Sequence, residues 1–371
     1  MNIVIFSPQR WSHLYVSKHH YALELAKNNS VWFISAPEKG IGSDHSVEKP
    51  VKGLNLSLLK YKLMMPEIVK FKLPALYKKM VMGKLNSLLK NVTGRPDVVI
   101  DFGCYQLFDS MDFLEASKKI LFLVDDFNHI KPSKRGAEKA FSVSTNIVEK
   151  FGRHGIPVTF INHGIAEVFA RKASERLQNS NYELSNAEKL KFGYSGNLFI
   201  RFMDIPVLQE TVQNNPSVEF HFFGSMEFDA NNQRHVSWNQ FLRSAPNIKL
   251  HGHVTPAQLA EMYDDLDGFL LCYKPDYKDY HGENSHKVFE YLSTGKVMVS
   301  TYLSLYEGST LINSSPKDKN EAFTDVFNNT VKSVAQYNSP MLQEQRIKLA
   351  LDNTYAKQVK RIAAEFESNE N

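Results

Sequence analysis

The chain has 371 residues, of which 43% are hydrophobic and 23% charged, so it is long enough for two ordinary domains that each bury a core. Its formal net charge of +4 gives no global indication of nucleic-acid binding. No apolar run approaches the roughly 18 residues of a membrane-spanning helix, and the short apolar stretch after Met1 lacks the basic start of a signal peptide. Cys104 and Cys272 both end apolar runs, which favours free buried thiols over a disulfide and fits a reducing cytoplasm.

The first predicted elements are a strand over residues 3–6, a loop, a helix and a second strand over residues 31–34. This order is typical of a doubly wound parallel sheet. No Gly-x-Gly-x-x-Gly follows the first strand, which argues against a dinucleotide cofactor there. The first loop carries Arg10, Trp11 and His13, and we expect at least one of them to line a cleft. The alternative is an exposed loop with a packed tryptophan.

Residues 52–95 form a strongly basic stretch in which lysines alternate with apolar residues and Glu67 is the only acid. This pattern is typical of amphipathic helices that lie on anionic lipid, with the lysine stems reaching to the headgroups. The alternative is a set of helices that cover the sheet and point lysines at water. Because ordinary surfaces mix charges of both signs, the single sign favours a membrane-facing segment.

Two further strands are predicted within residues 96–103 and 119–127, and they end in Asp101, Asp125 and Asp126. Ligands of open α/β sheets bind at the carboxyl ends of the strands, so these carboxylates are candidates for cleft-facing groups. A metal-binding pair of aspartates is the alternative. Adjacent residues on a strand end point in opposite directions, however, and we predict no metal site.

Strands at residues 141–145 and 157–161 complete a first domain, which we place at residues 1–170. The polar stretch 171–190 is the predicted interdomain linker. A second domain is predicted over residues 191–350, followed by a C-terminal segment, 351–371.

The second domain opens with a strand that runs into a glycine turn at Gly193 and Gly196, and Arg201 follows. Glycine lets the backbone approach a ligand closely, although this pattern is weak evidence on its own. Strands at residues 218–223, 248–254 and 269–273 continue the alternation of strands and helices. The acidic run 264–267 imitates the Asp-x-Asp of metal-dependent transferases, but the end of a helix and the start of a strand explain it better.

The pattern of residues 281–301 predicts a loop, a helix and a strand in direct succession. The helix has one buried face, because its apolar residues follow the spacing i, i+3, i+4 at Val288, Tyr291 and Leu292. Gly295 lies where a helix-ending glycine is expected, and the apolar run 297–299 is typical of a buried parallel strand.

The start of this helix has the features of an anion site. Asn284 or Ser285 is a plausible N-cap, and the free backbone N–H groups of a helix start favour an anion. Lys287 adds a positive charge in the first turn, which indicates a phosphate. Glu290 lies one turn further, where its carboxylate could accept hydrogen bonds from sugar hydroxyls. The alternative is a solvated i, i+3 pair of Lys287 and Glu290.

This segment resembles the donor-binding helix of retaining glycosyltransferases of the GT-B fold, the large family-four group. In that family the glutamate equivalent to Glu290 holds the nucleotide ribose, and the preceding loop wraps the donor sugar and diphosphate. Many members carry an earlier glutamate eight positions before. Here Gly282 stands at that position, and Glu283 is the nearest acid.

The resemblance implies further site residues. The glycine turn with Arg201 would grip the donor diphosphate, and the segment near Val254 would hold the base. The implied donor-site residues are Gly196, Asn197, Arg201, Val254, Tyr273, Glu283, Asn284, Ser285, His286, Lys287 and Glu290. Arg10 and Trp11 would contact the acceptor. Family enzymes place an imidazole or carboxylate of the first domain near the sugar, and the candidates are Asp126, His129 and His13.

The turn at Asn162-His163-Gly164 resembles the one that closes the first domain in the family, with His163 where asparagine is usual. The implied fold is α/β, of the GT-B type: two Rossmann-like domains whose parallel sheets face a cleft, and a C-terminal helix, 351–371, that crosses back to the first domain. No side chain is an evident covalent nucleophile.

The expected activity is retaining, metal-independent transfer of a sugar from a UDP- or GDP-sugar, without a cofactor, to a glycan or lipid-linked acceptor in cell-surface polysaccharide synthesis. The protein is expected in the cytoplasm, peripherally bound to the anionic inner leaflet of the membrane, with no nucleic-acid partner. One alternative is a sugar-nucleotide epimerase that uses first-domain carboxylates as acid and base. Another is a non-catalytic subunit that binds a nucleotide sugar, which the missing glutamate at Gly282 would explain.

Overall fold

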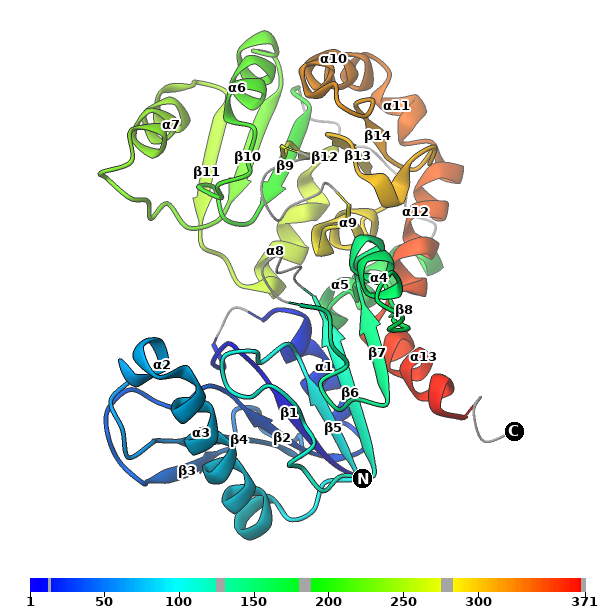
Figure 1. Ribbon diagram of the computed structural model, residues 1–371. Helices are drawn as coiled ribbons and strands as arrows, with labels where there is room; N and C mark the ends of the chain where they lie inside the picture. Colours follow the sequence, from blue (N-terminus) through cyan, green and yellow to red (C-terminus); the bar gives the residue numbers. More distant parts are fainter. Residues whose placement is uncertain (13–14, 125–130, 180–187, 275–282, 368–371) are drawn as a thin grey trace. The chain divides into compact units, whose positions relative to one another are not determined.

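The computed structural model describes residues 1–12, 15–124, 131–179, 188–274 and 283–367 (Figure 1). The chain divides into two units, one made of Met1–Asn162 together with Tyr355–Asn371 and the other of His163–Thr354. Each unit contains a mainly parallel sheet with helices packed on it, so the predicted α/β fold with two parallel-sheet domains is confirmed.

The first unit is built on an eight-stranded sheet with the order β3-β4-β2-β1-β5-β6-β7-β8, in which only β3 runs antiparallel to its neighbour β4. The strands are β1 (Asn2–Phe6), β2 (Ser30–Ile34), β3 (His45–Glu48), β4 (Leu56–Tyr61), β5 (Val98–Asp101), β6 (Lys118–Leu123), β7 (Lys139–Ser142) and β8 (Thr159–Phe160). The helices are α1 (Ser17–Leu25), α2 (Val69–Lys72), α3 (Pro74–Leu88), a π-helical turn (Leu89–Thr93), α4 (Thr145–Gly152) and α13 (Tyr355–Glu367).

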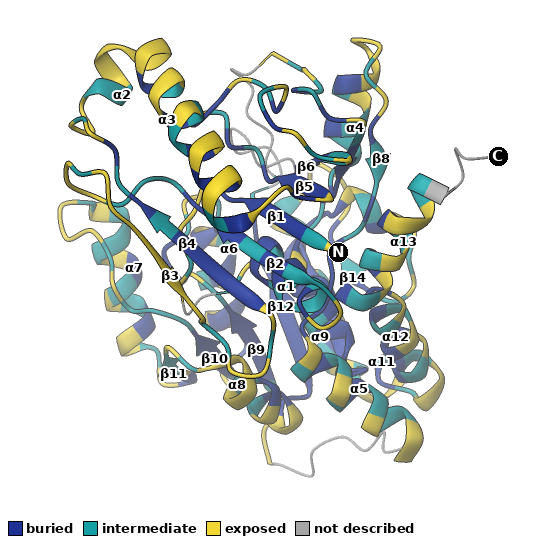
Figure 2. Ribbon diagram, turned by 90° about the horizontal axis from the view of Figure 1, so that it is seen from below, coloured by how far each residue is buried: buried dark blue, intermediate teal, exposed yellow. Residues whose placement is uncertain are grey.

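Both faces of this sheet are buried, because successive side chains of a strand point to opposite faces. On β1, Ile3 and Ile5 join the apolar cluster that includes α1 and α13, whereas Val4 and Phe6 join the cluster that includes α3. Helix α3 contributes a face with i, i+4 spacing, formed by Tyr77, Val81 and Leu85. Figure 2 shows the resulting pattern, with buried central strands and an exposed outer side of α3.

Helix α13 belongs to the first unit although it lies at the end of the chain. It packs on α1, where the ring of Tyr355 stacks on His20 with centroids 4.8 Å apart. The ammonium of Lys118 lies 4.9 Å from the ring of Phe366. The C-terminal helix therefore returns to the first unit, as the resemblance implies.

The second unit is built on a fully parallel sheet with the order β11-β10-β9-β12-β13-β14. The strands are β9 (Lys191–Ser195), β10 (Glu219–Phe223), β11 (Ile248–Gly252), β12 (Gly268–Leu271), β13 (Val297–Ser300) and β14 (Asn313–Ser314). The helices are α5 (Glu167–Asn179), α6 (Ile205–Asn214), α7 (Gln233–Ser244), α8 (Pro256–Met262), α9 (His286–Leu292), α10 (Phe323–Lys332), α11 (Val334–Tyr337) and α12 (Pro340–Asp352), with 3-10 turns at Tyr263–Asp265, Ser304–Tyr306 and Asn320–Ala322.

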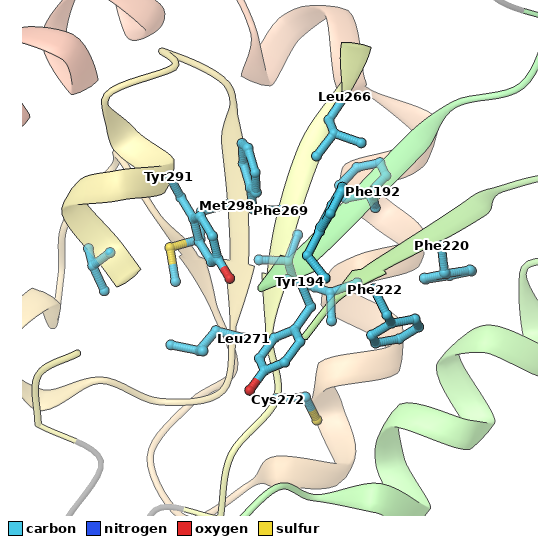
Figure 3. Packing of buried hydrophobic residues seen from close by; sticks show 14 of the residues in the cluster. Phe192, Tyr194, Phe220, Phe222, Leu266, Phe269, Leu271, Cys272, Tyr291 and Met298 are labelled. Atoms are coloured by element: carbon cyan, nitrogen blue, oxygen red, sulfur yellow. The ribbon is translucent and has the colours of Figure 1, made fainter. Parts of the chain in front are cut away.

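The core of the second unit is dense in aromatic rings (Figure 3). Tyr291 of α9 stacks on Phe269 of β12 with centroids 4.4 Å apart, which fixes the helix on the sheet. Gly193 is required by this packing, because a Cβ there would overlap the side chain of Leu266. The expectation that Gly193 lets a ligand approach is therefore wrong.

The stretch expected as a linker, 171–190, is helical as far as Asn179. Phe169 and Ala173 lie four residues apart on one side of α5, and both are buried where the helix packs on α8 and α12 of the second unit. This apolar pair makes α5 part of a core, and the second unit begins at His163. Residues 180–187 of that stretch lie outside the described residues.

The basic stretch 52–95 is not one amphipathic surface. The stretch includes Leu56, Leu58 and Leu59, which are buried in β4, and Leu85, which lies on the buried face of α3. Both ends of the stretch therefore belong to the core. Among the residues that the structure describes, no helix is long and apolar enough to cross a membrane.

Candidate functional site

Three glycines lie directly after or at the carboxyl ends of neighbouring strands of the second unit. Gly196 follows β9 and donates its N–H to the carbonyl of Phe223 at 2.8 Å, and Gly224 donates to the carbonyl of Gly252 at 2.8 Å. A Cβ on Gly224 would overlap the carbonyl oxygen of Gly196. The backbones of β9, β10 and β11 therefore meet closely at the edge of the sheet where ligands of parallel sheets bind.

Lys287 lies against this glycine turn. Gly196 has a φ of +133°, and a Cβ there would lie 2.6 Å from Cε and 3.1 Å from Nζ of Lys287. The lysine is only 9% exposed, and its burial lowers the pKa of the ammonium while the charge of Glu290 opposes the shift. The alternative interpretation, in which Lys287 and Glu290 form a solvated i, i+3 pair, is therefore wrong for Lys287, because this side chain is buried.

Glu290 lies one helical turn from Lys287. Burial raises the pKa of its carboxyl to about 7, and the positive charge of Lys287 opposes that rise. The site thus holds one buried cation and one carboxyl group that titrates near neutral pH. Such shifted groups gather at functional sites, because burial and a specific charged neighbour act on them together.

A network of tyrosine hydroxyls fixes the turn after β9 to α9. The backbone N–H of Ser195 donates to the Tyr291 hydroxyl at 2.9 Å, and the Tyr263 hydroxyl donates to Ser195 Oγ at 2.6 Å. The hydroxyls of Tyr194 and Tyr273 lie 2.9 Å apart, and that of Tyr194 also donates to the carbonyl of Asn197 at 3.2 Å. Tyr273 is thus buried, and its hydrogen bond with the Tyr194 hydroxyl helps to fix the turn after β9.

The loop before α9 carries the other predicted donor-site residues. Ser285 occupies the N-cap position with extended backbone angles, and its side chain makes no capping hydrogen bond. Glu283 is buried, and Asn284 Oδ1 accepts a hydrogen bond from the Tyr306 hydroxyl at 3.5 Å. His286 is exposed at the first helical position.

Three predicted residues lie on exposed or half-exposed loops at the same edge of the sheet. Asn197 and Arg201 are exposed in the loop after β9, where Asn197 Oδ1 accepts the N–H of Phe199 at 2.9 Å. Val254 is half-buried just after β11.

His163 is a site residue that the prediction from sequence did not include. It is 8% exposed, and its ring centroid lies 6.2 Å from that of His286. Burial and the nearby charge of Lys287 lower its pKa to about 4, so the imidazole is neutral at physiological pH. The available signal was the histidine itself, in a turn where the resembling family has asparagine.

The candidate residues of the first unit are only partly described. Arg10 donates from Nη2 to the carbonyl of Pro37 at 2.6 Å and lies 3.4 Å from Glu38, while Trp11 is half-buried. The candidates for a catalytic group near the sugar, His13, Asp126 and His129, lie outside the described residues, as does Asp125.

Asp101 is not a ligand-facing carboxylate. It is fully buried and accepts a hydrogen bond at 3.0 Å from Nε of Arg135, and a second at 2.8 Å from the backbone of Cys104. A buried ion pair with its remaining hydrogen bonds satisfied by the backbone is a structural element, so the expectation that Asp101 faces a cleft is wrong.

The acidic run 264–267 is the end of a helical turn and the start of β12, as expected. Asp264 pairs with Lys172 at 2.8 Å and with Arg176, and Asp267 accepts the N–H of Lys191 at 2.9 Å. Over the described part of the chain, no cluster of three or more histidine, cysteine, aspartate or glutamate side chains could hold a metal ion.

Comparison with known proteins gives one family and many similar structures. Residues 206–363, which include the α9 helix, match the family described as glycosyl transferase-like. Sucrose-phosphate synthase from Thermosynechococcus elongatus is similar over 99% of both chains, with a TM-score of 0.66 and 11% identity. A trehalose-6-phosphate structure from E. coli with UDP-2-fluoro glucose bound is similar over 98% of both chains, with a TM-score of 0.68 and 10% identity.

The lipopolysaccharide outer core galactosyltransferase WaaB is similar over 98% of this chain and 99% of its own, with a TM-score of 0.64 and 13% identity. No curated protein sequence matches the chain. The fold and the matched residues define the class as GT-B glycosyltransferases, which confirms the recognition from the sequence. Residues 206–363 match the glycosyl transferase-like family, and this match together with the fold supports a transferase enzyme.

Proposed function

We propose that the protein transfers a sugar, with retention of configuration and without a metal ion, from a nucleoside diphosphate sugar to a glycan or lipid-linked acceptor of cell-surface polysaccharide synthesis. The observation that carries the proposal is the ammonium of Lys287 buried against the Gly196 turn, with Glu290 one turn further along α9. The E. coli structure that contains UDP-2-fluoro glucose supports UDP as the nucleotide.

In this proposal Lys287 stabilises the departing diphosphate. Negative charge develops on the leaving group in the transition state, and a cation fixed in a buried site stabilises it more strongly than a solvated one. Arg201, exposed in the loop after β9, supplies a second cation when donor is bound. Two cations take the place that a divalent metal ion has in other transferases.

Glu290 holds the ribose through hydrogen bonds that its ionised carboxylate accepts from two hydroxyls. Asn197, Val254 and the loop 283–286 complete the donor site around the base, the diphosphate and the sugar, and the buried Tyr273 supports it through the contact of its hydroxyl with Tyr194. The leaving phosphate itself takes the proton of the acceptor hydroxyl, assisted by a group of the first unit, for which His13, Asp126 and His129 remain the candidates.

The test of the donor site is a thermal-shift panel of UDP, GDP, ADP, CDP and dTDP, without metal, on the wild type and on Glu290→Ala. A ligand that binds only the folded protein raises the melting temperature by mass action. We expect one diphosphate to stabilise the wild type and the Glu290→Ala variant to lose that shift. Glu344→Ala is the matched control, because Glu344 is a half-exposed helical glutamate of the same unit that pairs with Lys348. If no diphosphate raises the melting temperature, the donor does not bind on α9.

A patch of exposed apolar side chains around α2 and α3 supports binding to the cytoplasmic face of a membrane. Six of the eleven large apolar side chains that are exposed in the described residues lie in this patch, which we name the α2–α3 patch: Met64, Ile68, Phe71, Leu73, Leu76 and Met80. Phe71 is 75% exposed, with the ammonium of Lys70 5.5 Å from its ring. Lys72 and Lys79 are exposed beside it.

An anionic bilayer suits both parts of the α2–α3 patch. The apolar side chains enter the boundary of headgroups and acyl chains, and each lysine near the surface contributes about 1 kcal/mol of attraction to anionic lipid. A glycosyltransferase with a lipid-linked acceptor needs such a face, because the acceptor does not leave the bilayer.

The membrane proposal is tested by co-sedimentation with vesicles of phosphatidylcholine, with and without phosphatidylglycerol. We expect binding only to the anionic vesicles, weakened by salt, and about tenfold weaker in Phe71→Ser, because burying this ring contributes roughly 1.5–3 kcal/mol. Met341→Ser is the control, since Met341 is 64% exposed but lies in the second unit. Equal binding of the wild type and Phe71→Ser would contradict a role for the patch.

A further inference from the structure

Tyr291 places a polar group in the aromatic core of the second unit (Figure 3). The tyrosine is fully buried, and its ring stacks on Phe269 of β12. A phenylalanine would fill the same space, and a buried hydroxyl costs free energy unless it is hydrogen-bonded. The hydrogen-bond partners of this hydroxyl therefore show what the oxygen contributes.

The hydroxyl of Tyr291 meets three polar groups of a single residue, Ser195, the last residue of β9. It accepts the backbone N–H of Ser195 at 2.9 Å, lies 3.2 Å from Ser195 Oγ, and donates to the carbonyl oxygen of Ser195 at 3.5 Å. Ser195 is only 5% exposed, and hydrogen bonds shielded from water are electrostatically stronger than exposed ones. This one hydroxyl thus holds both the backbone and the side chain at the end of β9.

A second buried tyrosine completes the network. The hydroxyl of Tyr263 donates to Ser195 Oγ at 2.6 Å, which leaves the hydrogen of Ser195 Oγ for Tyr291. Burial raises the pKa of both tyrosine hydroxyls, and the charge of Glu290 adds to the rise. Both hydroxyls therefore stay protonated, and both lie within electrostatic range of the carboxyl group of Glu290.

Helix α9 contacts the turn after β9 at two consecutive residues. Tyr291 and Lys287 are four residues apart, so they lie on the same side of the helix. Tyr291 holds Ser195, and Lys287 lies so close to the next residue, Gly196, that a Cβ there would be 2.6 Å from its Cε. The hydroxyl contact therefore sets how far the Gly196 turn lies from the ammonium of Lys287.

This separation matters for any ligand that the turn and Lys287 bind together. A glycine turn has little stiffness of its own, because glycine has access to more backbone conformations than other residues. A binding constellation has to be held within about 0.5 Å of its productive geometry by the groups that support it. For the Gly196 turn, the hydroxyl of Tyr291 is such a support.

We propose that Tyr291 is a positioning residue, whose hydroxyl holds the Gly196 turn where the turn and Lys287 bind the same diphosphate. The inference rests on the proposed function and deepens it, because it identifies a residue that sets the geometry of the diphosphate site. Tyr291 acts through Ser195 and Gly196, and the ligand itself is bound by the turn and by Lys287.

The test compares the binding of UDP and UMP, without metal, to the wild type and to Tyr291→Phe by isothermal titration. If the thermal-shift panel selects another base, its diphosphate and monophosphate replace them. The two nucleotides differ by one phosphate, so the ratio of their dissociation constants measures the grip on the diphosphate. We expect this preference for UDP to fall about fivefold in Tyr291→Phe, as for one lost hydrogen bond, while UMP affinity changes by less than about twofold. A general loss of stability would weaken both nucleotides equally.

Thr211→Val is the matched control. Thr211 is fully buried on α6, and its hydroxyl donates to the carbonyl of Val207 at 2.8 Å and lies 3.0 Å from the hydroxyl of Thr324 on α10. This variant also removes a buried hydroxyl from the second unit, and the preference for UDP should not change. Tyr263→Phe should lower the preference by about twofold, because Ser195 keeps its backbone bond to Tyr291. It serves if Tyr291→Phe does not fold.

The outcomes separate this inference from the proposed function. If UDP binds the wild type more tightly than UMP and Tyr291→Phe keeps the full preference, the positioning role is overturned and the donor site stands. An equal fall in Tyr291→Phe and Thr211→Val would also overturn it, since general loosening would explain both. If the wild type binds no diphosphate, or binds it no better than the monophosphate, the proposed donor site fails and the inference fails with it.

Discussion

Gly196 is the residue whose lack of a side chain matters most directly to the proposed donor site. Its φ of +133° is one that residues with a Cβ rarely adopt, and the space where a Cβ would lie is taken by Lys287. The lysine can lie flat on the turn only because the residue beneath it is glycine. Position 196 therefore controls where the cation of the site lies.

We predict that Gly196→Ala weakens binding of the nucleoside diphosphate about tenfold, which corresponds to about 1.4 kcal/mol, because the added methyl group displaces Lys287. The control is Gly308→Ala, since Gly308 has a φ of +73° but no atom within 4 Å of the point where a Cβ would lie. Both variants carry backbone strain of about 1 kcal/mol. Isothermal titration should show the affinity loss in Gly196→Ala alone, and similar losses in both variants would contradict the role of Lys287.

The raised pKa of Glu290 leads to a dependence of donor affinity on pH. Burial raises this pKa to about 7, so the carboxyl is mostly protonated below pH 7 and ionised above it. If the ionised carboxylate accepts hydrogen bonds from the ribose hydroxyls, affinity for the nucleotide sugar rises as the pH increases through 7. Below pH 7 the affinity should change by up to about tenfold for each pH unit. Glu290→Gln should bind with a flat profile over the same range. A wild-type profile as flat as that of the variant would contradict the ribose contact.

The same shift affects stability with the opposite sign. The folded second unit keeps a proton on Glu290 that the unfolded chain releases near pH 4.5. The contribution of Glu290 to the free energy of unfolding is therefore complete below pH 4.5 and is lost as the pH rises through 7. Donor binding and stability of the unliganded unit therefore change in opposite directions between about pH 5 and 7.

At the scale of elements, the end of α9 is held by a buried arginine of α12. Nη1 of Arg346 donates to the carbonyls of Gly295 at 2.9 Å and Tyr337 at 2.8 Å, and Nε donates to that of Leu311 at 2.9 Å. The guanidinium is fully buried, and burial lowers its pKa to about 10. It connects the turn after α9 to two other segments of the second unit.

We predict that Arg346→Met lowers the free energy of unfolding by about 3–5 kcal/mol, because buried carbonyl groups lose charged donors. Arg243→Met, in which an exposed arginine of α7 loses one contact to Asn239, should change it by less than about 0.5 kcal/mol. Urea unfolding curves measure both values. A small effect in Arg346→Met would mean that water replaces the guanidinium at these carbonyls.

The helix and strand of residues 286–300 could be predicted from the sequence because their signals are local. Val288, Tyr291 and Leu292 follow the helical spacing, and Gly295 has the positive φ that ends such a segment. The α5 helix carries a weaker signal, because Phe169 and Ala173 stand among charged residues, and a polar composition of this kind predicts a linker.

Contacts between distant residues could not be predicted in the same way. The partner of Asp101 is Arg135, 34 residues further along the chain, and nothing near Asp101 indicates the pair. The sequence motif did indicate that Lys287, Glu290 and the Gly196 turn lie close together. That His163 joins them depends on tertiary packing, which the local sequence does not specify.

At the scale of the whole molecule, the chain leaves and re-enters the first unit at two neighbouring points. Ile165, just after the first crossing, donates its N–H to the carbonyl of Asn353 at 2.9 Å, just before the second. The second unit is therefore an insertion into the first, between Asn162 and Tyr355.

We predict that a protein cut after Thr354, which lacks α13, has a normal second unit and a destabilised first unit. Truncation exposes the apolar surface of α1 and the sheet that Tyr355 and Ile362 cover, at a cost of about 2–5 kcal/mol. Hydrogen exchange followed by mass spectrometry should show faster exchange in β1 and α1 and unchanged exchange in β9 and β12. Equal protection of both units would contradict a structural role for α13.

The position of α13 also has a consequence for synthesis on the ribosome. Domains generally fold in order as the chain emerges, N-terminal first. Here the first unit stays incomplete until α13 has left the ribosome, whereas the second unit is complete as soon as Thr354 has emerged. The nascent chain thus completes its second unit before its first, and a ribosome that stops short of Tyr355 releases a protein whose second unit is complete and whose first unit lacks α13.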